Sequence, residues 1–117
     1  MVIQNADIKT QDKYLPMMRR AAKKHKASHA DLAFLEDRVA LRHGKKQIYG
    51  SQVNSDSLGS FLAPLRHPEN VDKRRTKMGL APLAGYLESC YLAWNPENYK
   101  KQLPEIEKRE ANVYKPE

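Results

Sequence analysis

Six consecutive residues near the middle of the chain carry the side chains best suited to binding a polar ligand. The segment Gln47-Ile48-Tyr49-Gly50-Ser51-Gln52 contains two amides, a phenol and a hydroxyl, groups that both donate and accept hydrogen bonds. If the segment is extended, Gln47, Tyr49 and Ser51 lie on one side, and Gly50 permits a tight turn or close backbone approach. Two interpretations stay open. Either these side chains contact a ligand, or the two glutamines satisfy loop backbone groups while Tyr49 packs on the helices.

The adjacent pair Asp37-Arg38 could extend such a site. Neighbouring residues on a helix point about 100° apart, so each must find its partner elsewhere. Arg38 could pair with Asp7 or Asp72 and fix a helix to a loop, which we favour, or it could anchor an anionic ligand. The candidate ligand site consists of Asp7, Arg38, Gln47, Tyr49 and Gln52.

Clustered cations form the second candidate site. Residues 1–27 carry seven Lys and Arg against two carboxylates, residues 80–117 carry five against six, and the whole chain has a net charge of +7. A positive face attracts anionic partners, although a merely solvated surface is the commoner cause of such a pattern. The candidates for this basic face are Arg19, Arg20, Lys23, Lys24, Lys73, Arg74, Arg75 and Lys77.

The other reactive residue types form no recognised motif. His25 and His29 have the i, i+4 spacing of zinc ligands, but Ser28 is expected to begin a new helix between them. Cys90 is the only cysteine, so neither a disulfide within the chain nor a thiolate zinc cluster can form. We therefore expect no metal and no cofactor, and we favour a protein that is not an enzyme.

Helices are expected to position these groups. Within Thr10–Lys26, apolar residues recur at spacings of three and four, which is typical of one buried helix face. Ser28 is expected to cap a second helix that ends near Gly44, giving an antiparallel pair. Later helices are expected from Pro68 to about Met78, from Pro82 onward, and over Glu97–Gln102. The helix from Pro82 is expected to place one apolar face inward, made of Leu83, Tyr86, Leu87, Cys90 and Tyr91.

Together these patterns predict one small, mainly α domain. We expect four to five helices with an irregular loop or short β-hairpin at about residues 46–65, a single domain over residues 1–103, and a mobile charged tail over residues 104–117. The 117-residue chain shows no secretory signal and no apolar run long enough for a membrane span, which excludes a membrane partner and favours the cytoplasm.

Several short motifs, in order, resemble a known family. They are Val2-Ile3-Gln4-Asn5-Ala6-Asp7, Leu35-Glu36-Asp37-Arg38-Val39, Gln47-Ile48-Tyr49-Gly50-Ser51-Gln52, Val71-Asp72-Lys73-Arg74-Arg75 and Gly79-Leu80-Ala81-Pro82-Leu83 with Tyr86. Over residues 2–88 the chain resembles the bacterial domain-of-unknown-function family 6624. The resemblance implies a shared helical fold and no activity. It also implies that the helical region found upstream in relatives is missing here, and that Asn5 replaces a histidine common among them.

Two functional hypotheses follow. The first is a non-enzymatic basic binding module that engages an acidic protein surface or nucleic acid, as a regulator or inhibitor of a larger complex. The second is a small hydrolase or transferase with a polar pocket at the candidate ligand site. Convergence of Asp7, Arg38 and Tyr49 on a closed pocket would favour the enzyme.

Overall fold

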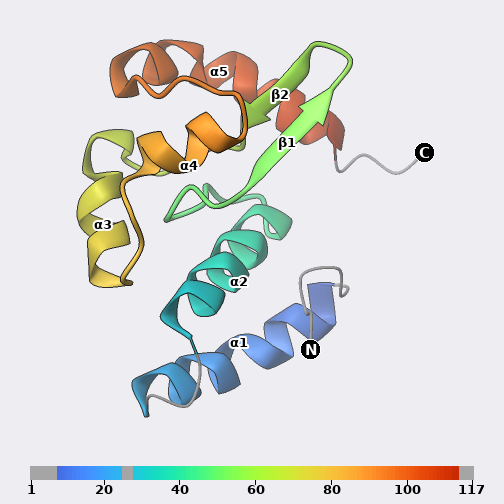
Figure 1. Ribbon diagram of the computed structural model, residues 1–117. Helices are drawn as coiled ribbons and strands as arrows, with labels where there is room; N and C mark the ends of the chain where they lie inside the picture. Colours follow the sequence, from blue (N-terminus) through green and yellow to red (C-terminus); the bar gives the residue numbers. More distant parts are fainter. Residues whose placement is uncertain (1–7, 25–27, 114–117) are drawn as a thin grey trace.

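The computed structural model describes residues 8–24 and 28–113, which contain five α-helices and one β-hairpin (Figure 1). The predicted fold class, a small mainly α domain with a short hairpin, is confirmed. The elements in chain order are α1 (Ile8–Lys23), α2 (His29–Arg42), β1 (Val53–Asp56), β2 (Gly59–Leu62), the 3-10 turn η1 (Pro68–Asn70), α3 (Val71–Lys77), α4 (Leu83–Ser89) and α5 (Pro96–Val113).

Helices α1 and α2 run in opposite directions and pack against each other at one end of the molecule (Figure 1). The predicted cap of α2 is confirmed, because the Ser28 hydroxyl oxygen accepts hydrogen bonds from the backbone N–H groups of Ala30 and Asp31 at 3.1 and 3.3 Å. Such a cap satisfies two of the N–H groups that the first turn of a helix leaves unpaired. The sequence of α2 therefore sets where this helix begins.

The β-hairpin pairs Val53 with Leu62 and closes through a turn between Asp56 and Gly59. The Asp56 side chain accepts the Leu58 N–H at 2.9 Å, and Gly59 has a φ of 114°, a conformation that L-residues with side chains avoid. Two further hydrogen bonds from Arg109 of α5 to the Asp56 carboxylate, at 2.6 and 2.7 Å, tie the hairpin to the last helix. The hairpin is thus fixed at its tip as well as at its base.

Helix α5 is much longer than the predicted Glu97–Gln102. It continues through Pro104 to Val113, because Tyr99 and Ile106 bury their side chains in the core and Glu110 is only 7% exposed. The domain boundary expected after residue 103 therefore falls inside this helix. Burial of one face outweighs the backbone hydrogen bond that a proline removes.

The end of α4 also differs from the expectation. The helix stops at Ser89, so Tyr91 does not join Leu83 and Leu87 on the buried face. Instead Tyr91 is 98% exposed and has a left-handed φ of 61°. The run of apolar residues predicted the buried face correctly only as far as the helix extends.

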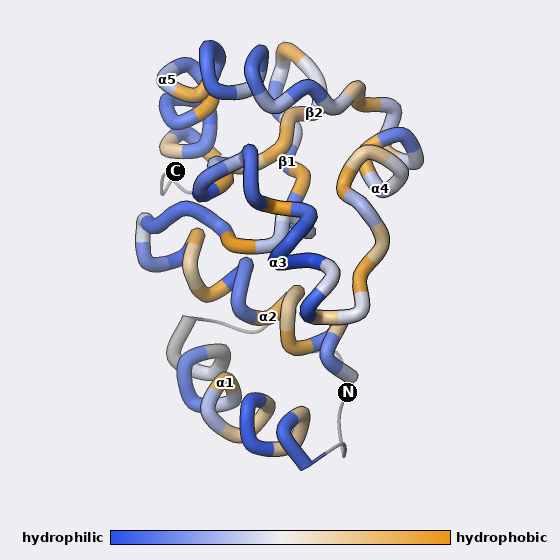
Figure 2. The backbone as a smooth tube through the Cα atoms, turned by 90° about the vertical axis from the view of Figure 1, so that its left-hand side faces the viewer, coloured by the Kyte–Doolittle hydropathy of each residue, from blue (hydrophilic) through white to orange (hydrophobic). Residues whose placement is uncertain are grey.

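Two hydrophobic clusters make up the interior. A larger one joins the hairpin with α3, α4 and α5, and a smaller one lies between α1 and α2 around Leu15, Leu32 and Leu35. Figure 2 shows the hydrophobic, orange segments gathered where β1, β2 and α4 meet. The segment from Gln47 to Gln52 follows α2 and leads into the hairpin, so it joins the two clusters.

Candidate functional site

The buried carboxylate of Asp37 organises the segment from Gln47 to Gln52. Its Oδ1 accepts the backbone N–H groups of Ile48 and Tyr49 at 2.7 and 2.9 Å. Its Oδ2 accepts the backbone N–H of Ser51 at 3.0 Å and the Ser51 hydroxyl at 2.6 Å. Asp37 is 0% exposed, and burial raises its pKa above the ordinary value although these hydrogen bonds act to lower it.

The two glutamines complete the same loop. The Gln47 amide, also 0% exposed, donates to the carbonyls of Gln52 and Ala63 at 3.0 and 2.9 Å and accepts the Gln52 N–H at 2.9 Å. The Gln52 amide donates to the Ser51 hydroxyl at 3.0 Å, and its oxygen accepts from Arg38 at 3.0 Å. Hydrogen bonds within the fold thus occupy both amides.

Arg74 and Arg75 hold the loop from its other side. Arg75 donates to the carbonyls of Tyr49 and Ala81 at 2.7 and 2.6 Å and is only 4% exposed. Arg74 donates to the carbonyl of Ile48 at 2.7 Å and to two carbonyls just before η1. Burial lowers the pKa of both guanidinium groups. These arginines were expected on the basic face, and their placement corrects that expectation: α3 turns them inward, where a planar guanidinium can satisfy several carbonyls at once.

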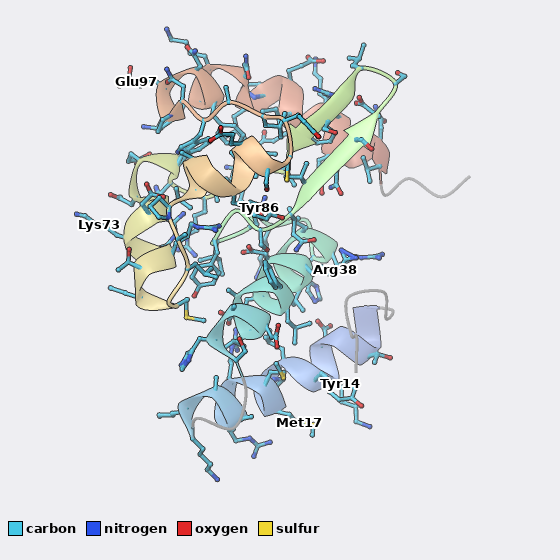
Figure 3. The ribbon with its side chains drawn as sticks, in the orientation of Figure 1. Tyr14, Met17, Arg38, Lys73, Tyr86 and Glu97 are labelled. Carbon is cyan, nitrogen blue, oxygen red and sulfur yellow. The ribbon has the colours of Figure 1, made fainter. Side chains whose placement is uncertain are left out.

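Tyrosine hydroxyls contribute on both sides of the loop. Tyr86 reaches from α4 and donates to the Ser51 carbonyl at 2.6 Å (Figure 3). The Tyr49 hydroxyl lies 3.5 Å from the Glu36 carboxylate. Burial raises the pKa of both phenols, for Tyr49 with the added effect of the nearby carboxylate of Glu36. Neither hydroxyl is therefore activated as a base at neutral pH.

The candidate ligand site is thus only partly brought together. Gln47, Gln52 and Arg38 are linked through hydrogen bonds, and Tyr49 lies in the same loop with its backbone held by Asp37 and Arg75. Asp7, together with Asn5, lies outside the described residues. The polar groups of this network are directed at one another, an arrangement that fixes a loop.

Sequence reasoning did not single out Asp37 as the centre of this network. A signal was available in the sequence, because Asp37 lies four residues after Ala33 and four before Leu41, in a row of otherwise apolar positions. The structure buries all three residues. A carboxylate in a buried row must accept hydrogen bonds from neighbouring backbone or side chains. The spacing therefore could have indicated that Asp37 anchors a loop.

Two of the grooves in the described part of the chain lie away from this network. One of about 510 Å³ runs between the ends of α2 and α5, lined by Leu41, Arg42, Gly44, Lys45, Pro64, Glu107, Glu110 and Ala111. The other, about 280 Å³, is lined by the aromatic side chains of Phe61, Trp94 and Tyr99 among others. Of the candidate ligand-binding residues that the structure describes, Arg38, Gln47, Tyr49 and Gln52, none lines either groove. Within residues 8–24 and 28–113, no group of three or more His, Cys, Asp or Glu side chains could hold a metal ion.

The remaining cations of the basic face lie on the outer surfaces of α1 and α3. Arg20, Lys23 and Lys24 on α1 are exposed, as is Lys77 on α3. Lys73 on α3 is also exposed and points outward in Figure 3. Arg19 instead pairs with Glu36 of α2, with its Nη2 2.6 Å from the carboxylate. Lys13, which sequence reasoning left out, is exposed on α1 as well.

Residues 1–95 match the model of a family described as Family of unknown function (DUF6624), and the chain therefore belongs to this family. The resemblance inferred from the motifs is confirmed. The matched region holds α1 to α4 and the hairpin and stops just before α5. No curated protein and no solved structure matches the chain. In the described part of the chain, no helix is long and apolar enough to cross a membrane.

Proposed function

We propose that this chain is a non-enzymatic binding module whose basic surface engages an acidic protein surface or nucleic acid. We define the basic surface as the exposed cations of α1 and α3 that form no ion pair within the described residues: Lys13, Arg20, Lys23, Lys24, Lys73 and Lys77. The observation that carries the proposal is that six exposed cations on these two helices lack a carboxylate partner among the described residues.

Helix α1 concentrates this charge. Asp12 is its one acidic residue, and the Asp12 carboxylate lies 2.8 Å from the His43 imidazole. Helix α5, by contrast, carries equal numbers of basic and acidic side chains. In Figure 1 the C-terminal ends of α1 and α3 lie on the same side of the molecule. Exposed cations without a carboxylate partner create a positive potential that steers an anionic partner.

The alternative, a small hydrolase or transferase, gains little support from the geometry. An active site needs polar groups that are directed at a substrate. The described candidates Arg38, Gln47 and Gln52 instead hydrogen-bond within the fold. We therefore propose that the loop around Asp37 is a structural scaffold for the binding surface.

Affinity capture at two ionic strengths tests the proposal. The tagged protein is used to retain partners from a lysate of its host at about 0.1 M and about 1 M salt, where the Debye length is about 10 Å and about 3 Å. A stoichiometric protein or nucleic acid retained only at low salt is the expected result. The triple variant Arg20→Gln, Lys23→Gln, Lys24→Gln should lose this partner.

A variant with the same loss of charge elsewhere provides the control. Lys45, Lys101 and Lys108 are exposed residues outside α1 and α3, and their replacement with Gln should leave binding within about twofold, since salt screens charges that lie more than about 10 Å from the bound partner. Equal losses in the two triple variants would refute a localised basic surface. Retention of nothing at low salt would refute the proposed function.

A further inference from the structure

The outer side of α1 carries an apolar strip beside its cations. We define the strip as Tyr14, Met17 and Ala21. At 100° per residue, these positions lie within about 60° of Met17 around the helix axis. Met17 is 51% exposed, and the other two are half-buried. Figure 3 shows the Met17 side chain on the side of α1 that faces away from α2, whereas Tyr14 flanks the strip and also packs against the cluster between α1 and α2.

A row of cations borders this strip along its length. Lys13, Arg20 and Lys24 lie within about 60° of Met17 on the side opposite Tyr14, and all three are exposed. A single exposed apolar side chain is common on protein surfaces and needs no explanation. Here the exposed methionine has half-buried apolar neighbours, and this strip runs parallel to the row of cations over about two turns.

No other element covers this face in the described structure. Helix α1 packs extensively only on α2, where Leu15 and Ala22 belong to the smaller cluster and Tyr14 and Met18 pack against it, so that Met17 is the most exposed residue of the strip. Methionine is flexible and polarisable, and it recurs at surfaces that adapt to a partner. The strip therefore has the composition of a contact surface.

Charge and shape together select one kind of occupant. A second copy of this chain, docked symmetrically, would bring two rows of cations against each other, which is unfavourable. Phosphates of a nucleic acid would use the cations and leave the apolar strip unused. An amphipathic helix with carboxylates along one edge uses both, with apolar residues on Met17 and acidic residues on Arg20 and Lys24.

We propose that the outer face of α1 is a docking surface for an acidic amphipathic helix of a partner protein. This inference rests on the proposed function and names its partner class. Met17 lies at the centre of the contact. Lys13, Arg20 and Lys24 set the orientation of the bound helix.

Fluorescence anisotropy with three labelled probes tests the inference. The first probe is a synthetic peptide of about 20 residues with Leu at helical i, i+3, i+4 and i+7 spacing and Glu beside it. The second is the same composition in scrambled order, and the third is a DNA duplex of about 20 base pairs with a similar length of charged surface. We expect the amphipathic peptide to bind at least about fivefold more tightly than its scramble.

The variant Met17→Lys separates apolar from purely ionic binding. It adds a positive charge, yet it should weaken binding of the amphipathic peptide about fivefold to tenfold. The reason is that the peptide can no longer bury the exposed part of the Met17 side chain. Met17→Leu should keep the affinity. Leu58→Lys, at a 76% exposed residue on the hairpin tip, adds the same charge elsewhere and should not weaken binding.

The outcomes distinguish this inference from the proposed function. If the scramble binds as well as the amphipathic peptide, or if Met17→Lys strengthens binding to every probe, the helix-docking inference is overturned while a basic surface remains. Preferential binding of the duplex also overturns the helix-docking inference and assigns the surface to nucleic acid. If no probe binds at about 0.1 M salt, both are overturned. Unchanged thermal unfolding of the Met17 variants ensures that each loss reports binding.

Discussion

Replacing Asp37 with asparagine removes one charge and one acceptor from the centre of the loop network. Asparagine can still accept the N–H groups of Ile48 and Tyr49 through its single oxygen. Its NH2 group would take the place of Oδ2, so the Ser51 N–H would lose its acceptor. The Ser51 hydroxyl can rotate and accept a hydrogen bond from this NH2 group. One buried N–H without a partner costs about 1–3 kcal/mol. We therefore expect Asp37→Asn to lower the free energy of unfolding by about 2–3 kcal/mol, including the weaker hydrogen bonds of a neutral acceptor.

Asp37→Ala should be more damaging, because all four donors lose their acceptor. A loss of about 4 kcal/mol or more is expected, which is a large part of the total stability of a small domain. Urea denaturation followed by far-ultraviolet circular dichroism measures both variants. Glu88→Gln, at an exposed residue of α4, is the control and should stay within about 0.5 kcal/mol of the wild type. If Asp37→Asn also stays within that range, Asp37 does not hold the loop.

Three further predictions concern backbone conformation and charge. Gly50→Ala should destabilise the fold by about 1–3 kcal/mol more than Gly44→Ala in urea denaturation. Both glycines have a φ of 73°, so the backbone strain is the same. Only at Gly50 would the new Cβ lie 2.9 Å from the side chain of a buried leucine, Leu83. Tyr91→Gly should raise the free energy of unfolding by about 0.5–1 kcal/mol, because glycine relieves the left-handed conformation of an exposed residue. In an NMR titration of the carboxyl carbons, Asp56 should have a midpoint below 3.8, because its hydrogen bonds with Arg109 lower its pKa.

For each of these three predictions, a specific result would contradict the reasoning. Equal effects of the two glycine substitutions would mean that the segment at Gly50 can move away from α4. Loss of stability in Tyr91→Gly would mean that the exposed ring makes a contact that stabilises the fold. For Asp56, a lowered pKa means that its stabilising effect is complete above pH 3.8 and is lost as the pH falls through the folded-state value. A midpoint unchanged by Arg109→Gln would contradict this origin.

The pKa of Asp37 should be shifted in the opposite direction from that of Asp56. Burial raises its pKa, so the folded state binds more protons than the unfolded state above pH 3.8, and its contribution to stability decreases as the pH rises through this window. The same carbon-detected NMR titration should place the Asp37 midpoint above 3.8. A midpoint below that value would show that its four hydrogen bonds outweigh burial.

Local rules predicted the parts of the fold that depend on neighbouring residues. The Ser28 cap, the stop near Gly44 and the helix between Pro68 and Gly79 follow from turn and capping chemistry within a few residues. The extension of α5 through Pro104 could not be predicted in this way. It depends on burial of Ile106 against residues far away in the chain, and local propensity penalises the proline.

For the candidate sites too, the sequence predicted residue types and general roles, and only the fold shows the partners. The alternative in which Gln47 and Gln52 satisfy loop backbone groups was stated from the sequence, but only the fold shows which carbonyls accept their amides. Arg74 and Arg75 were expected to be surface cations, because a short helix with four basic residues does not reveal which side faces inward. Their donors satisfy carbonyls from three different segments, a requirement that the sequence around them does not express.

NMR chemical-shift mapping with the amphipathic acidic peptide and the DNA duplex tests the central proposal most directly. If the basic surface is the functional site, amide shifts on addition of the bound probe should concentrate in residues 10–24 and 73–77, and the loop from Gln47 to Gln52 should stay unchanged. Shifts confined to that loop, or to either groove, would contradict a binding module that acts through α1. Shifts confined to the loop would favour a ligand site in the polar network around Asp37.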